Sequence, residues 1–122
     1  MTNVHDNPDR RRYEIYDGEQ LAGFSDYKLT KGKIAFTHTE VDPTHGGRGL
    51  ARELVTEELD DARRQGLAVL PFCPYVRKVI ASAPEKYLDL VPAQDRERFQ
   101  LPAGADVDAP DVQPILDAEE RS

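Results

Sequence analysis

Glycine residues cluster between positions 46 and 49, immediately before a segment with helical periodicity. Gly46, Gly47 and Gly49 lack a Cβ atom, so the backbone there can approach a ligand closely. The unpaired N–H groups of a first helical turn favour an anion at the same place, and Arg48 adds a positive charge. The segment predicts a phosphate or pyrophosphate site, and a plain glycine-rich turn is the alternative interpretation.

Two common phosphate-binding motifs do not fit this segment. A Walker A loop ends in Gly-Lys-Ser/Thr, whereas here Gly49 is followed by Leu50. The dinucleotide-binding fingerprint follows the first strand of a parallel βαβ unit, whereas the strands expected before this loop form an antiparallel meander. Neither motif therefore explains the glycines.

A histidine and a glutamate lie two residues apart in the strand expected over residues 33–41. Simple alternation places Ile34, Phe36, His38 and Glu40 on one face of that strand. Glu40 stands at the strand end, where it is a candidate general base, and His38 is of a residue type that exchanges protons near neutral pH. The alternatives are a solvated carboxylate for Glu40 and a hydrogen-bonded structural imidazole for His38.

The single cysteine, Cys73, ends an apolar run and precedes Pro74 and Tyr75 at an expected helix start. A helix N-terminus favours the thiolate, so Cys73 is a candidate nucleophile or a contact to the reacting group. A free cysteine is otherwise a small, buried and inert side chain. Tyr75 is a candidate general acid, and its alternative role is an aromatic cap on the core.

The elements that must position these residues follow from periodicity and turn signals. Strands are expected over residues 13–16, 20–29, 33–41 and 67–72, and helices over residues 50–65 and 75–83. Asp17-Gly18 and Lys31-Gly32 mark tight turns between the first three strands, and Asp42-Pro43 ends the third. The strand after the helix should run parallel to the third, because a helix links them. The pattern predicts an α/β (α+β) fold with a mixed sheet, in which an antiparallel meander precedes strand, glycine loop, helix and strand.

Length and charge limit the function classes. The 122 residues fit one domain, and a formal net charge of −7 opposes non-specific binding to nucleic acid or to anionic membranes. No apolar run is long enough to span a bilayer, no secretory signal is visible, and one free thiol fits a reducing compartment, so a cytoplasmic protein is expected. Residues 1–12 are expected to form a flexible tail, residues 13–102 the domain, and residues 103–122 an acidic disordered tail.

Residues 39–55 resemble the acetyl-CoA motif of the GNAT acetyltransferase superfamily, whose core is Gln/Arg-x-x-Gly-x-Gly/Ala. Gly49 and Ala51 occupy its last two fixed positions, whereas Gly46 stands where the motif has Gln or Arg. Three further segments in order, residues 36–41, 71–76 and 84–91, resemble the small YjdJ-type group of GNAT-like domains.

The resemblance implies an N-acetyltransferase that transfers an acetyl group from acetyl-CoA to an amine acceptor, which the sequence does not identify. It implies that the strand end binds the pantetheine arm and that the loop amides bind the pyrophosphate. The cofactor-binding residues expected on this basis are Thr39, Val41, Gly46, Gly47, Arg48, Gly49, Leu50 and Ala51. Glu40 or His38 would then be the base, Cys73 would meet the thioester, and Tyr75 would protonate the CoA thiolate.

Full-length GNAT domains insert two helices between their first two strands, and these helices help to form the acceptor pocket. Here the hairpin at Asp17-Gly18 is expected to close that connection, which implies an open acceptor site. A non-catalytic CoA-binding or interaction module is therefore the alternative function.

Overall fold

The computed structural model describes residues 2–43 and 48–101, and for Arg48 it describes the backbone alone. The tail expected over residues 103–122 and most of the glycine loop lie outside the described residues. The elements are, in chain order, β1 (Thr2–Asn7), β2 (Arg12–Asp17), β3 (Gln20–Thr30), β4 (Lys33–Val41), α1 (Arg48–Arg64), β5 (Ala68–Pro71), α2 (Pro74–Ser82), α3 (Pro84–Tyr87), and the 3-10 helices η2 (Leu88–Leu90) and η3 (Ala93–Asp95).

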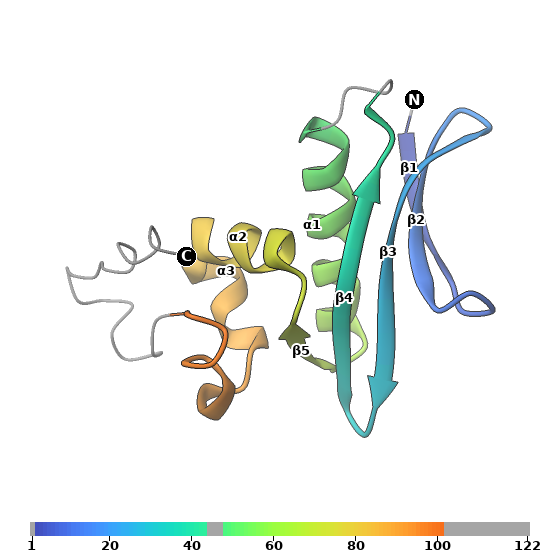
Figure 1. The fold of residues 1–122 in the computed structure, drawn as a ribbon. Helices are drawn as coiled ribbons and strands as arrows, with labels where there is room; N and C mark the ends of the chain where they lie inside the picture. The colour runs from blue at the N-terminus through green and yellow to red at the C-terminus, as the bar shows by residue number, and fades with distance from the viewer. Residues whose placement is uncertain (1, 44–47, 102–122) are drawn as a thin grey trace.

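The strands form one mixed sheet in the order β1-β2-β3-β4-β5. Strands β1 to β4 are antiparallel neighbours, and β5, which follows α1, runs parallel to β4. The short strand β5 lies beside one end of β4 (Figure 1). This arrangement confirms the predicted fold class, a meander followed by strand, loop, helix and parallel strand.

Strand β1 corrects the expectation of a flexible tail over residues 1–12. Thr2 Oγ1 donates a hydrogen bond to Glu53 Oε2 of α1 at 2.7 Å, and Val4 packs against the hydrophobic core. Val4 is the one aliphatic residue among the six of β1, so hydrophobic alternation does not reveal this strand.

The presence of β1 also moves the connection at which a full-length GNAT domain inserts its helices. Residues 8–11 join the first two strands in a tight turn, in which Arg10 N donates to Asn7 O at 3.1 Å. The hairpin at Asp17-Gly18 joins β2 to β3 instead, and Gly18 has a positive φ of 64° there. In the described chain neither connection contains a helix. The two helices of a full-length GNAT domain are therefore missing between β1 and β2, and the Asp17-Gly18 hairpin is not the connection that lacks them.

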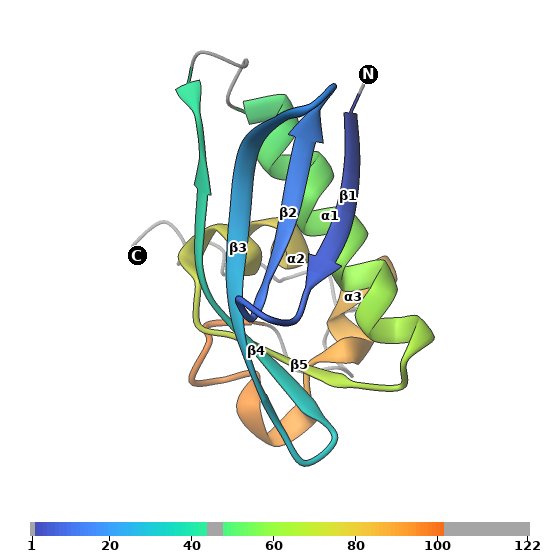
Figure 2. The same ribbon diagram turned by 90° about the vertical axis from the view of Figure 1, so that its right-hand side faces the viewer.

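The three α-helices of the described chain lie on one face of the sheet, and the opposite face is open (Figure 2). Helix α1 buries Leu54, Val55 and Leu59 completely against the sheet. Gly66, with a φ of 73°, follows the helix as the expected terminating residue. Among the described helices, none combines the length and apolar character needed to cross a membrane.

A β-bulge in β4 changes which side chains share a face. His38 pairs with Asp26 of β3, and Phe36 pairs with the next residue of β3, Tyr27. Thr37 therefore has no partner in this register and is an extra residue in β4. Phe36 is fully buried under the helices, whereas the side chains of His38 and Glu40 are 58% and 65% exposed on the open face. The prediction that His38 and Glu40 share the face of Ile34 and Phe36 was therefore wrong, because a bulge reverses the alternation.

Candidate active site

Strands β4 and β5 diverge, which leaves part of one edge of β4 without a neighbouring strand in the described chain. The two strands pair over Lys33–Phe36 of β4, and the last hydrogen bond in this register runs from Cys73 N to Phe36 O at 2.8 Å. Beyond that point β4 continues to Val41, while the chain after β5 turns into α2 at Cys73. We call this divergence the fork.

Thr39 and Val41 turn their backbone groups toward the free edge of the fork. Asp42 N donates to Ala22 O of β3 at 2.8 Å, and successive residues of an antiparallel strand direct their backbone groups to alternate sides. Thr39 and Val41 each lie an odd number of residues from Asp42, and their register with β3 is regular. Their N–H and C=O groups therefore point away from β3, where an extended ligand can pair with them.

The free edge of β4 leads toward the N-terminus of α1, which begins at Arg48. The first turn of α1 contains no acidic residue, so no side chain there offsets the positive end of the helix dipole. A Cβ built on Gly49 meets no described atom within 4 Å, so the fold itself leaves space at this backbone. Leu50 packs against the core and Ala51 is half-buried, while Gly46 and Gly47 lie outside the described residues.

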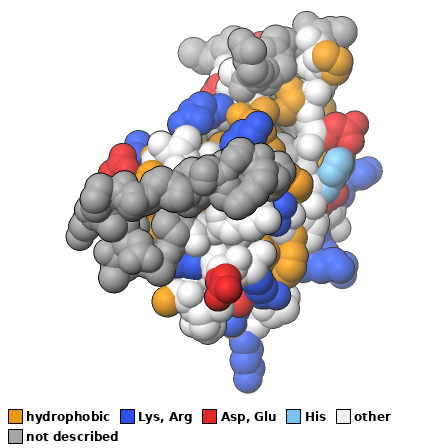
Figure 3. Space-filling model, turned by 60° about the vertical axis from the view of Figure 1, so that its left-hand side comes forward, with side chains coloured by type: hydrophobic (Ala, Val, Ile, Leu, Met, Phe, Trp, Pro, Cys, Tyr) orange, Lys and Arg blue, Asp and Glu red, His pale blue; other side chains and the backbone are white. Residues whose placement is uncertain are grey.

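His38 and Glu40 form a pair on the open face of the sheet. His38 Nε2 lies 3.1 Å from Glu40 Oε1, and the His38 ring lies 6.2 Å from the ring of Phe24. Both polar side chains are well exposed. In the face shown in Figure 3, exposed hydrophobic side chains form small separate patches among charged ones. The pair can accept a proton from a group that approaches from solvent.

Cys73 lies on the other side of β4, at the closed end of the fork. Its side chain is 3% exposed, and its thiol donates a hydrogen bond to Thr39 Oγ1 at 3.3 Å. Cys73 is also the N-cap residue of α2, without a side-chain capping bond. Because Thr39 faces the helices, Glu40 points to the opposite face, so the structure places Glu40 and Cys73 on different sides of the strand.

Two residues that the sequence interpretation missed continue from this contact into the core. Ser25 Oγ lies 3.2 Å from Thr39 Oγ1 and donates to Glu58 Oε2 at 3.1 Å. Glu58 is completely buried, and desolvation raises its pKa well above the usual range. A signal was available, because Glu58 stands four residues from both Leu54 and Ala62 on the buried stripe of α1.

Tyr75 is the second residue of α2 and lies two positions after Cys73. Its side chain is half-buried and packs against the hydrophobic core. Its packing is that of an aromatic cap on the core, and its role as a general acid stays a prediction.

A cavity of about 290 Å³ lies where the start of β3 pairs with the end of β4. Its lining residues are Leu21, Ala22, Gly23, Phe24, Glu40, Val41, Asp42 and Pro43. Most of its lining residues are apolar, and Glu40 and Asp42 are the two acidic ones. It offers space next to the His38–Glu40 pair.

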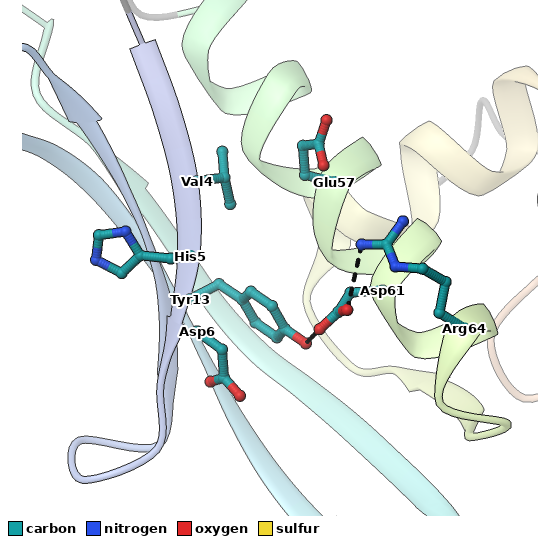
Figure 4. Close-up of a pocket in the computed structure, with 7 residues that line it drawn as sticks. All are labelled: Val4, His5, Asp6, Tyr13, Glu57, Asp61 and Arg64. Carbon is teal, nitrogen blue, oxygen red and sulfur yellow. Dashed lines mark hydrogen bonds and ion pairs between the residues drawn. The ribbon is translucent and has the colours of Figure 1, made fainter.

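A second cavity, of about 280 Å³, lies between β1 and α1 at the opposite edge of the sheet (Figure 4). Tyr13 Oη donates to Asp61 Oδ2 at 2.5 Å, and Arg64 pairs with Asp61 Oδ1 at 3.2 Å. Burial and the bond to Asp61 raise the pKa of Tyr13, and the same bond helps to lower the pKa of Asp61 against the effect of its own burial. These groups are bonded to one another and lie at the edge opposite the fork. No cluster of three or more metal-ligating side chains occurs among the described residues.

Comparison with known proteins gives one informative result. No curated protein matches the chain. A family model described as GCN5-related N-acetyl-transferase matches residues 12–90, which run from β2 through the fork to η2. The match covers more than half of the chain and includes α1, Cys73 and the β4 edge. The chain therefore belongs to the GCN5-related N-acetyltransferase family.

Proposed function

We propose that this protein is an N-acetyltransferase that binds acetyl-CoA along the free edge of β4 and transfers its acetyl group to an amine. The observation that carries the proposal is the fork. The backbone groups of Thr39 and Val41 face an edge without a strand in the described chain, and that edge leads to the N-terminus of α1, whose first turn contains no acidic residue.

The residues present fit the two ends of such a donor. The free edge of β4 offers alternating N–H and C=O groups, which suit the amide-containing pantetheine arm. The start of α1 offers the N–H groups of a first helical turn, and an added Cβ at Gly49 would meet no described atom within 4 Å, which suits a pyrophosphate. We assign pantetheine binding to Thr39 and Val41, and pyrophosphate binding to the loop from Gly46 to Ala51.

The chemistry required of the protein is proton transfer on both sides of the acetyl group. Bound acetyl-CoA supplies the acetyl thioester. An attacking amine must be neutral, and we assign the acceptance of its proton to the His38–Glu40 pair, whose side chains lie 3.1 Å apart on the open face. Cys73 and Tyr75 lie at the closed end, where a group that protonates the departing sulfur is needed. Direct attack by the amine is the simpler route, since a covalent step on Cys73 is not required by the thioester.

The acceptor site is expected to be open. The connections of the meander are tight turns in the described chain, so they provide no wall around the His38–Glu40 pair. This arrangement suits an extended or macromolecular amine as well as a small one. We further propose that the protein belongs to the YjdJ-type group and acts in the cytoplasm.

A non-catalytic CoA-binding module is the second candidate, and the strong exposure of Glu40 favours it. The two functions differ in turnover and not in affinity for CoA. Consumption of acetyl-CoA should therefore be measured with a panel of small amines, peptides with a free N-terminus and lysine-containing proteins. Amine-dependent release of CoA supports the transferase, whereas tight CoA binding without release in any arm supports the module.

A further inference from the structure

A line of four polar side chains runs from the fork into the core. It starts at Cys73, passes through Thr39 Oγ1 and Ser25 Oγ, and ends at Glu58, with successive heavy-atom distances of 3.3, 3.2 and 3.1 Å. Three different strands or helices and the α2 N-cap contribute to it, so the line is a tertiary feature and not a local turn.

Glu58 is an unusual end for such a line. It is completely buried, and its second carboxyl oxygen, Oε1, has no hydrogen-bond partner among the described residues. A buried ionised carboxylate with one unpartnered oxygen is costly, so the neutral acid is favoured at this place. The fold keeps this group although a leucine or a valine would fill the stripe of α1 without that cost.

We propose that Glu58, Ser25, Thr39 and Cys73 form a buried proton relay, which delivers the proton of Glu58 through the Cys73 thiol to a sulfur anion at the fork. Hydroxyl groups suit the two middle positions because each can accept one proton and donate another by rotating. This inference rests on the proposed function for the identity of the proton acceptor, the departing CoA thiolate.

The step balances in protons and charge. The carbon–sulfur bond of the acetyl thioester breaks, and its electron pair stays on the CoA sulfur. That sulfur takes the proton of Cys73 Sγ. In the resting arrangement Cys73 donates to Thr39 and Ser25 donates to Glu58 Oε2, so both hydroxyls must rotate before the proton can move outward. The thiol proton is then replaced from Thr39, the Thr39 proton from Ser25, and the Ser25 proton from Glu58. The thiol and both hydroxyls end unchanged, and Glu58 becomes a carboxylate that regains a proton from solvent before the next turnover.

The raised pKa of Glu58 supports this direction of transfer. An acid works best when it still holds its proton near the working pH, and burial gives Glu58 that property. Cys73 is the titratable group that faces Glu58 and raises its pKa further, while the hydrogen bond from Ser25 acts in the opposite sense. The pKa of Glu58 therefore responds to the charge of Cys73 at the other end of the relay.

The first test needs no acetyl-CoA. Infrared spectra near neutral pH should contain the C=O band of a protonated carboxyl group, lost in Glu58→Gln and kept in the control Glu57→Gln, an exposed neighbour on α1. Alkylation of Cys73 at alkaline pH should be several-fold faster in Glu58→Gln than in wild type, because a charged Glu58 opposes the thiolate. The relay would be overturned if Cys73 is alkylated with the same pH profile in wild type and Glu58→Gln, or only in denaturant. Absence of the protonated-carboxyl band from the wild-type spectrum would overturn it as well.

The second test uses turnover. Thr39→Val keeps the side-chain shape and removes one hydroxyl, and it should lower kcat by about 10²-fold with the KM for acetyl-CoA unchanged. Ser25→Ala should act in the same way. In wild type kcat should fall as pH rises through the pKa of Glu58, and in Glu58→Gln this fall should disappear. A full rate in Thr39→Val together with a large loss in Tyr75→Phe would assign the acid to Tyr75 instead.

The two tests separate the relay from the proposed function. If wild-type protein transfers acetyl to no amine, the proposed function fails, and the infrared and alkylation results still decide whether Glu58 and Cys73 exchange a proton. If turnover is normal in all relay variants, the transferase stands and the relay fails.

Discussion

Gly49 occupies a helix position at which the fold itself has no use for a glycine. It is the second residue of α1, it is not among the glycines with positive φ, and an added Cβ meets no described atom within 4 Å. Alanine is favoured over glycine by about 1 kcal/mol inside a helix, and we take roughly half of that for the first turn. Gly49→Ala should therefore stabilise the free protein by ~0.5 kcal/mol, which is roughly 2–4 °C in Tm for a domain of this size.

The same substitution should weaken CoA binding, because a Cβ would stand between the backbone and the pyrophosphate. We expect Gly49→Ala to raise the Kd for CoA at least about tenfold, equivalent to ~1.4 kcal/mol of binding free energy. We expect Gly49→Val to abolish CoA binding. Thermal unfolding and calorimetric titration with CoA measure the two effects on one sample. Asp60→Ala, at an exposed position farther along α1, is the matched control and should leave Kd unchanged. A Gly49→Ala protein that binds CoA as tightly as wild type would refute the close approach.

Three further predictions follow from buried and exposed groups of the site. Burial raises the pKa of Glu58, so the folded protein keeps a proton that the unfolded chain releases above about pH 4.3. Between about pH 4.3 and the pKa of Glu58 in the folded protein, wild type should therefore lose stability relative to Glu58→Gln by ~1.4 kcal/mol for each pH unit. A difference in unfolding free energy, measured with urea, that is the same at both ends of this pH range would contradict the prediction. Saturating acetyl-CoA should slow the alkylation of Cys73, and equal rates with and without it would place the donor elsewhere. Glu40→Gln should lower kcat by about 10²-fold with little change in the KM for acetyl-CoA, and His38→Gln by less; unchanged kcat in Glu40→Gln would remove it as the base.

The central part of the fold could be predicted because its local signals are strong. Asp42-Pro43 ends β4, the apolar stripe of α1 has clear helical spacing, and Gly66 ends the helix with a positive φ. A helix between two strands then requires a parallel pair, which is the geometry that produces the fork. Thr39 and Val41 lie on the free edge of β4, and their binding of the pantetheine arm stays a prediction.

The parts that could not be predicted depend on tertiary contacts. Strand β1 has a single aliphatic residue, Val4, and it is held by pairing with β2 and by the bond from Thr2 to Glu53. The bulge at Thr37 has no local sequence signal, yet it decides which side chains face the helices.

The relay was missed for a related reason. In the sequence, the acidic residues of α1 suggest a solvated face, and only the four-residue spacing from Leu54 and Ala62 marks Glu58 as buried. The contact from Thr39 to Cys73 joins residues 34 positions apart, which no periodicity reveals. Side-chain placement at the site was therefore harder to predict than the strands and helices that carry it.

The binding position of acetyl-CoA is the central claim, and amide chemical shifts during a CoA titration test it most directly. The largest changes should fall on the amides of Thr39, Val41, Gly49, Leu50 and Ala51, with a smaller set at Cys73 and the start of α2. The residues around the cavity between β1 and α1 should stay unchanged. Saturable shifts in this pattern would support the account, whereas no change at millimolar CoA, or changes centred on Tyr13 and Asp61, would contradict it.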